Sequence, residues 1–389
     1  MKWRYANTVL ALCTLAFFAT MVARLVISPV VPDIGEAFSV STSAVGLALT
    51  GMWAAYALTQ FPSGLLGDRF GERRVILTAV GGTVVTSALL TVVPSYALFV
   101  VATVCLGAAA GLHYSVATSL LTRQFADIGR AIGIHVAGGP LAGLLAPVAA
   151  ALVGARYGWR WALALGVAAA IPVFALFARY VEPTPPRLPD RPMRDRMELR
   201  PLAELLSRPQ IAYTTGLAVL GAFTWQATAS FLPAFLEQGR DLPQTTAGLL
   251  FSLYFVVHGL TQPVMGSISD RYPRDLTVAG TMGVGIVGYG LLVVGRAVPV
   301  LVVGVVLAGL AMSWGAPLQS RFMDLLGDSE RGAGFGLVRT VYMTLGASGS
   351  VVVGVVSDLA GWTTAFALLA GLMVVGFASI SGVALLSGQ

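Results

Sequence analysis

The chain has 389 residues, of which 56% are hydrophobic and only 11% charged, with a formal net charge of +6 and a mean hydropathy of +0.81. A soluble domain carries about 25% charged residues, so this composition excludes an ordinary soluble protein and predicts a membrane protein. Arginines in short loops explain the positive charge of a membrane protein, so we expect no nucleic-acid partner.

The first apolar run predicts a membrane helix over residues 6–31. Its charged start resembles a signal peptide, but the run continues to Val31 without a small-residue cleavage site, so we expect an uncleaved helix. One charge, Arg24, lies inside this run. Because an unpaired guanidinium is costly in hydrocarbon, Arg24 should face a cavity, stack on an aromatic ring or reach the nearer interface.

Hydropathy and helix breakers predict eleven further helices, each too long for the ten-residue strands of a barrel. Their spans are 43–66, 75–93, 97–121, 131–153, 161–180, 210–235, 245–268, 276–294, 297–320, 334–356 and 362–385. A polar stretch separates six helices from six. We therefore predict a bundle at 1–181, a cytoplasmic linker at 182–208 and a second bundle at 209–389.

The two halves repeat each other. The segment "GLALTGMWAAYALTQFPSGLLGDRF", from Gly46, aligns with "GLLFSLYFVVHGLTQPVMGSISDRY", from Gly248. Near the end of each half, "YGWRWAL" matches "AGWTTAF" at almost the same offset. Repeated six-helix units with a site between them are a common layout of secondary transporters.

The segment "GLLGDRFGERR" resembles the signature between helices 2 and 3 of the major facilitator superfamily. The signature is filled by Gly64, Asp68, Arg69, Gly71, Arg73 and Arg74, and its weaker second copy keeps Gly266, Asp270 and Arg271. The resemblance covers essentially the whole chain and implies an all-α fold of 12 transmembrane helices in two pseudo-symmetric bundles.

From the residues alone, Gly64 should let helices approach closely and Gly71 should permit a tight turn. The resemblance implies a gate, in which Asp68 latches this loop to the start of helix 11 when the protein opens outward. The other interpretation is that the motif only fixes the topology.

The segment "GGPLAG" (Gly138–Gly143) partly resembles a signature of the family's drug antiporters. His135 stands where that signature has a glycine, so a helix kink and packing site is the other interpretation.

The placement of arginines predicts the orientation in the membrane. Loops on one side carry Arg69, Arg73, Arg74, Arg123, Arg271, Arg274 and the linker, whereas Arg156, Arg160, Arg240 and Arg296 lie on the other. The positive-inside rule makes the first side cytoplasmic. We therefore expect a multi-pass protein in the cell membrane of a prokaryote, with both termini cytoplasmic.

All 18 acidic residues lie in loops or at the ends of predicted helices. Exporters of cationic drugs usually need an intramembrane carboxylate, which disfavours that function. Two arginines do lie within helices, Arg24 and Arg339. No acid is an obvious partner for either, so the substrate is expected to supply the negative charge.

Other polar residues could line the same site. Tyr254, His258 and Gln262 share one helical face by their spacing of four. The remaining candidates are Gln60, His113, Trp225, Gln226 and Tyr342. Each is also explained by packing. His258 is the expected proton carrier if coupling is to protons.

The sequence thus predicts a monomeric secondary transporter of a small organic or inorganic anion, by proton symport or exchange. The alternative is efflux of lipophilic drugs by proton antiport. A sensor or receptor is a third possibility, but such a protein usually adds a soluble domain or long tail, and the sequence predicts neither. We expect no enzyme, cofactor or metal, because the sequence has no metal cluster, nucleophile triad or nucleotide loop.

Overall fold

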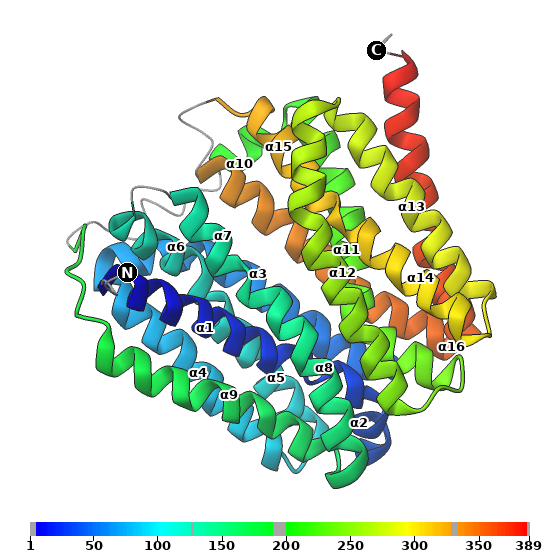
Figure 1. The fold of residues 1–389 in the computed structure, drawn as a ribbon, viewed down its shortest axis with the longest axis horizontal. Coiled ribbons are helices and arrows are strands. Elements are labelled where there is room, and N and C mark those ends of the chain that lie inside the picture. Colours follow the sequence, from blue (N-terminus) through cyan, green and yellow to red (C-terminus); the bar gives the residue numbers. More distant parts are fainter. Residues whose placement is uncertain (1–4, 126–127, 190–199, 328–332, 387–389) are drawn as a thin grey trace. The chain divides into compact units, whose positions relative to one another are not determined.

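The computed structural model describes residues 5–125, 128–189, 200–327 and 333–386. These residues form helices and connecting loops, with no strand among them (Figure 1). They pack into two compact units, one of residues 1–40 and 48–198, the other of residues 41–47 and 199–389. Residues 190–199 of the expected linker lie outside the description.

The first unit contains the helices of the predicted N-terminal bundle. They are α1 (Tyr5–Leu25), η1 (Ser28–Val30), α2 (Val31–Phe38), most of α3 (Thr42–Phe70), α4 (Glu72–Val92), α5 (Tyr96–Gly111), α6 (His113–Gln124), α7 (Ile128–Val136), α8 (Gly138–Tyr157) and α9 (Trp159–Tyr180). Residues of α1, α4, α6 and α9 share one buried apolar core.

The second unit contains the remaining helices. They are α10 (Arg200–Leu206), α11 (Pro209–Gln238), α12 (Gln244–Arg271), α13 (Arg274–Val294), α14 (Val298–Ala311), η3 (Met312–Trp314), α15 (Gly315–Leu325) and α16 (Ala333–Leu386). Residues 41–47 belong here because the Asp358 carboxylate accepts hydrogen bonds from the backbone N–H groups of Thr42 (3.0 Å) and Ser43 (2.8 Å). The dipole of α3 also stabilises a carboxylate at the start of that helix.

The prediction of twelve spanning helices is confirmed. Ten helical segments of the described chain are long and apolar enough to cross a membrane. One of them, α16, joins two helices across a kink at Gly361, where φ is 82°. With α16 counted as two helices the ten segments give eleven, and the 29-residue α3, which is not among the ten, is the twelfth.

Four of these spans are broken where the sequence predicted single runs. The first span changes from α1 to η1 and α2, with Pro29 and Pro32 at helix starts. Proline suits the first turn of a helix because an N–H group there would have no partner within the helix, so its loss costs nothing. The spans at 97–121, 131–153 and 297–320 are likewise divided, at Leu112, Ala137 and η3.

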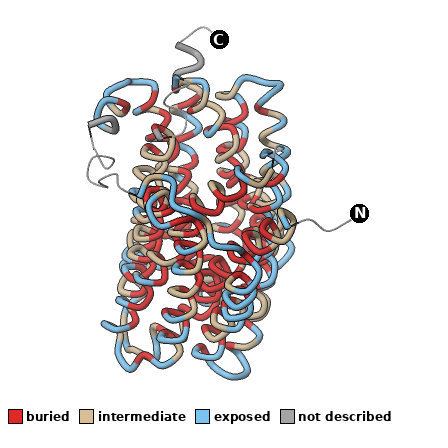
Figure 2. Tube along the Cα trace, turned by 90° about the vertical axis from the view of Figure 1, so that its left-hand side faces the viewer, coloured by how far each residue is buried: buried red, intermediate tan, exposed pale blue. Residues whose placement is uncertain are grey.

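Large apolar side chains remain exposed along the helices, among them Val101, Leu152 and Val287, each more than half exposed. Figure 2 shows exposed residues interleaved with buried ones along the helical tubes. Water would disfavour such surfaces, whereas lipid accommodates them. The surface therefore agrees with a multi-pass membrane protein.

Candidate functional site

Arg24, the next-to-last residue of α1, is 1% exposed. Its Nε donates to the carbonyl oxygen of Thr20 (3.1 Å) and its Nη2 to the sulfur of Met21 (2.8 Å). The side chain therefore runs back along α1, toward the start of that helix, as helical side chains generally do. Arg24 does not reach the surface, so the snorkelling alternative is wrong for this residue.

The guanidinium stacks on two rings of α3. Its carbon lies 4.0 Å from the ring centre of Tyr56 and 5.1 Å from that of Trp53. Cation–π contact compensates part of the desolvation of a buried cation. The expected stacking is thus present, yet Nη1 has no hydrogen-bond partner among the described residues, and no described carboxylate pairs with Arg24. The arrangement leaves a buried positive charge with an unused donor.

His113, at the start of α6, lies in a cluster of rings within the same unit. Phe17 of α1 stacks on it with ring centres 6.3 Å apart, and His135 of α7 lies 5.4 Å away. Gln60 is buried on α3, one turn beyond Tyr56. The structure therefore groups His113 with His135, which was not among the predicted site residues.

The "GGPLAG" glycines pack against this cluster. A Cβ atom on Gly138 would lie 2.6 Å from the carbonyl oxygen of Thr14, and one on Gly139 would lie 3.0 Å from the ring of Phe17. Both glycines therefore permit α8 to approach α1 closely. This contact favours the packing interpretation of the segment.

Three predicted residues of the second unit belong to one aromatic row. Trp225 of α11 packs on Phe255 (6.2 Å between ring centres), Phe255 packs on Tyr254 (5.2 Å), and Tyr254 stacks on His258 (6.3 Å). The shared face of α12 thus brings Tyr254 and His258 together. Gln262 lies one turn further along α12.

The other predicted residues of this unit lie on or against α16. Gln226 donates to the carbonyl oxygen of Met343 (3.0 Å). The neighbouring Tyr342 packs on Trp314 and Phe322, each with ring centres 6.3 Å apart. Arg339 is half-buried, one turn earlier on the same helix.

The signature loop joins α3 to α4. Gly71 has φ of 86°, and a Cβ atom there would overlap the carbonyl oxygen of Thr184, so the expected tight turn is confirmed. The Asp68 carbonyl accepts from the N–H groups of Arg187 (2.8 Å) and Leu188 (3.0 Å). A Cβ atom at Gly64 would meet no heavy atom within 4 Å, and the close helix approach expected there stays a prediction.

Arg73 of the loop binds the end of α9 and the residue after it. It donates to the carbonyl oxygens of Val181 (2.7 Å) and Ala178 (2.6 Å). Arg69 stacks on the adjacent Phe70 at 5.4 Å. The loop therefore fixes the start of the linker within the first unit.

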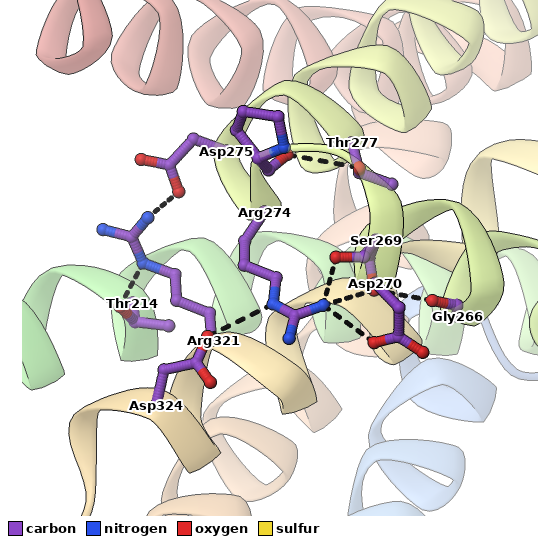
Figure 3. Close-up of polar contacts among 10 residues, drawn as sticks. Thr214, Gly266, Ser269, Asp270, Arg274, Asp275, Thr277, Arg321 and Asp324 are labelled. Atoms are coloured by element: carbon purple, nitrogen blue, oxygen red, sulfur yellow. Dashed lines mark hydrogen bonds and ion pairs between the residues drawn. The ribbon is translucent and has the colours of Figure 1, made fainter. Parts of the chain in front are cut away.

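Glu72 was missed by sequence reasoning because the signature allows any residue there. Its carboxylate is 1% exposed and pairs with Arg123 (3.0 Å) and Arg187 (3.6 Å). Its repeat mate, 202 residues later, is Arg274, which pairs with Asp270 (3.0 Å) and Asp324 (3.2 Å) (Figure 3). The same repeat position thus carries a residue that pairs with two opposite charges in each half, an acid in the first and an arginine in the second. Comparing the two repeats was the one way to find this position from the sequence.

We expect Glu72→Gln to lower the free energy of unfolding by about 1–2 kcal/mol, since it leaves Arg123 and Arg187 without their buried partner. The measurement is thermal unfolding in detergent by tryptophan fluorescence. Glu36→Gln, at an exposed carboxylate of α2, is the control and should change nothing. Equal unfolding temperatures for the two variants would contradict a structural role of Glu72.

Figure 3 shows the second copy of the signature in detail. Arg274 also donates to the hydroxyl (3.2 Å) and the carbonyl oxygen of Ser269, and Arg321 pairs with Asp275 and donates to Thr214 (3.0 Å). These contacts tie the ends of α11, α12, α13 and α15 together. Arg271 is exposed at the end of α12.

Comparison with known proteins places this geometry in a family context. The family model described as "Major Facilitator Superfamily" matches residues 13–244 and 216–386. A solved structure of the nucleoside transporter NupG superposes with a TM-score of 0.83 at 14% identity, over 97% of this chain and 99% of that one. That likeness shows a shared fold.

Three curated relatives are each 24% identical to the chain. They are "Probable sugar efflux transporter" of Helicobacter acinonychis (62% of this chain, 61% of that protein), "Probable sulfoacetate transporter SauU" of Cupriavidus necator (68% and 65%) and "Multidrug resistance protein B homolog" of Mycobacterium tuberculosis (88% and 74%). The matched region covers less than two thirds of the length of the first two. The first two names are those of transporters, and the third is that of a multidrug resistance protein.

Proposed function

The chain belongs to the Major Facilitator Superfamily of membrane transporters, and from this premise we propose that it moves a small organic or inorganic anion across the cell membrane. The observation that carries the proposal is Arg24: a fully buried guanidinium, stacked on Tyr56 and Trp53, with Nη1 unused. A carboxylate, sulfonate or similar oxyanion would supply the missing charge and acceptor.

The remaining candidate residues suit the same class of substrate. In the second unit, Arg339 carries a further positive charge, and rings and amides are carried by Tyr254, His258, Gln262, Trp225, Gln226 and Tyr342. In the first unit, Gln60 and His113 are of the same kinds. The name of the Cupriavidus relative includes sulfoacetate, a small organic anion, which supports this class of substrate.

The mode of transport is part of the proposal. The protein would act as a monomer that alternates access to its site, by proton symport or exchange. Both termini would be cytoplasmic by the positive-inside rule, and the loop with Asp68 would serve as a gate on that side.

Efflux of lipophilic drugs is the second candidate. The Mycobacterium relative and the apolar helices favour it. Against it stand the packing role of Gly138 and Gly139 and the lack of a carboxylate at any helix centre of the sequence.

Uptake into proteoliposomes by the purified protein separates these functions. Labelled acetate, sulfoacetate, sulfate and nitrate are compared with xylose and with the lipophilic cation ethidium. We expect exchange of internal for external label with at least one anion and no movement of ethidium. Transport of ethidium or xylose without any anion would contradict the proposal.

A further inference from the structure

Two histidines of the first unit form a buried pair that the anion site leaves unexplained. His113 and His135 are both fully buried, and their ring centres lie 5.4 Å apart. An N–H···N hydrogen bond of about 2.9 Å between two imidazoles places their centres about 5 Å apart. A small rotation of either ring would therefore let the two nitrogens share one proton.

The surroundings of the pair are apolar and aromatic. His135 packs on Phe17 and Tyr114, with ring centres 5.4 Å and 5.9 Å apart. Among the described residues, none makes a well-formed hydrogen bond to any of the four imidazole nitrogens of the pair. The carbonyl group of Cys13 on α1 lies near both rings. Buried polar atoms are nearly always paired in native structures, and one carbonyl oxygen cannot satisfy four imidazole nitrogens, so this place calls for a ligand.

A proton is the ligand that fits this place. Each neutral imidazole has one lone pair and one N–H group, so a proton taken by one ring can be donated to the lone pair of the other. The described part of the chain contains no group of three or more histidine, cysteine or acidic side chains able to hold a metal ion. Two like charges at this distance repel, so the pair takes up one proton and not two.

The charged and titratable groups near the pair are few. Those on α1 are Cys13 and Arg24; Tyr56 lies on α3 and Tyr114 on α6. Arg123, further along α6, is paired with Glu72, and Arg130 is exposed on α7. The Arg24 side chain runs back along α1 to Thr20, one turn from Phe17, whose ring packs on both histidines.

We propose that His113 and His135 form the proton-binding site of the transporter, coupled electrostatically to an anion held by Arg24. This inference rests on the proposed function and assigns its coupling step. The positive charge of Arg24 opposes a second positive charge on the pair, and a bound anion cancels that charge. Proton and anion therefore favour each other's binding by the same factor, which is the requirement for symport.

The proposal replaces His258 as the expected proton carrier. His258 stacks on Tyr254 in the second unit, without a second histidine beside it. A proton site at His113 and His135 also predicts whether transport moves net charge. A monovalent anion with one proton carries no net charge, so its accumulation should not respond to a membrane potential imposed with potassium and valinomycin.

The test uses the full-length protein in proteoliposomes, with the anion identified by the panel above. Exchange of labelled anion needs no net proton movement, whereas accumulation against a gradient does. A pH gradient of one unit should drive about tenfold accumulation by the wild-type protein. We expect His135→Asn to retain exchange and lose this accumulation, while Arg156→Gln, at an exposed arginine of α8, keeps both. Wild-type accumulation by His135→Asn, or an equal loss of accumulation in Arg156→Gln, would overturn the proposal.

A second measurement needs no substrate. The chain contains only three histidines, so ¹⁵N-histidine labelling of the purified, tag-free protein gives three imidazoles to follow. We expect the signals of His113 and His135 to change together with pH and those of His258 to change separately. If no anion is exchanged, the proposed function fails, and this titration still decides: independent titration of His113 and His135 overturns the proton site.

Discussion

Replacing Arg24 with glutamine is expected to reduce anion transport by about 30-fold or more, because the loss of a buried charge from a charge pair costs about 2–5 kcal/mol. The amide keeps a hydrogen-bond donor but loses the charge and the guanidinium fork. Arg24→Lys retains the charge without the fork and should recover only part of the transport. The measurement is the initial rate of labelled-anion exchange in proteoliposomes.

The stability of the same variants distinguishes a binding role from a structural one. Arg24 is a buried cation without a carboxylate partner among the described residues, and such a group costs folding free energy. Arg24→Gln should therefore unfold at the wild-type temperature or above it. Arg156→Gln is the matched control, since Arg156 is exposed at the end of α8 and stacks only on the adjacent Tyr157 at 5.7 Å. Normal transport by Arg24→Gln, or a lower unfolding temperature for it, would refute the binding role.

Tyr56 and Trp53 should behave as supports of that guanidinium. Their rings hold it by cation–π contact at 4.0 Å and 5.1 Å. Tyr56→Phe keeps the ring and should retain most transport, whereas Tyr56→Leu removes it and should weaken anion binding more.

Replacing Gly107 with alanine is expected to destabilise the first unit by about 3 kcal/mol, at the upper end of what overpacking usually costs. A Cβ atom at Gly107 of α5 would overlap the carbonyl oxygen of Met52 on α3, and backbone atoms cannot move aside as side chains can. The effect should appear as a lower yield of folded protein in gel filtration and a lower unfolding temperature.

Gly133→Ala is the control for this prediction. Gly133 lies exposed on α7, and its would-be Cβ meets no heavy atom within 4 Å. Alanine is the better helix former by about 1 kcal/mol, so this variant should be as stable as the wild type or more stable. Similar losses in the two variants would show that the α3–α5 contact is not the cause.

The candidate site was only partly predictable. Arg24 stands out because a single charge interrupts an apolar run, and that contrast is visible in one segment. Tyr56 and Trp53 lie in the repeated segment, but nothing in their spacing indicates that they face Arg24. His135 was noted only as an exception in a glycine signature, and its pairing with His113 joins residues 22 positions apart on two helices, α6 and α7.

The sequence by itself determined the membrane class, the twelve spans, the repeat and the buried charge, because hydropathy, breakers and isolated charges act within one segment. It also fixed the turn at Gly71, where the left-handed conformation requires glycine. Only the tertiary structure decided which side chains surround Arg24, that Glu72 binds two arginines, and that two histidines lie together. These facts depend on the packing of separate helices, which local patterns do not encode.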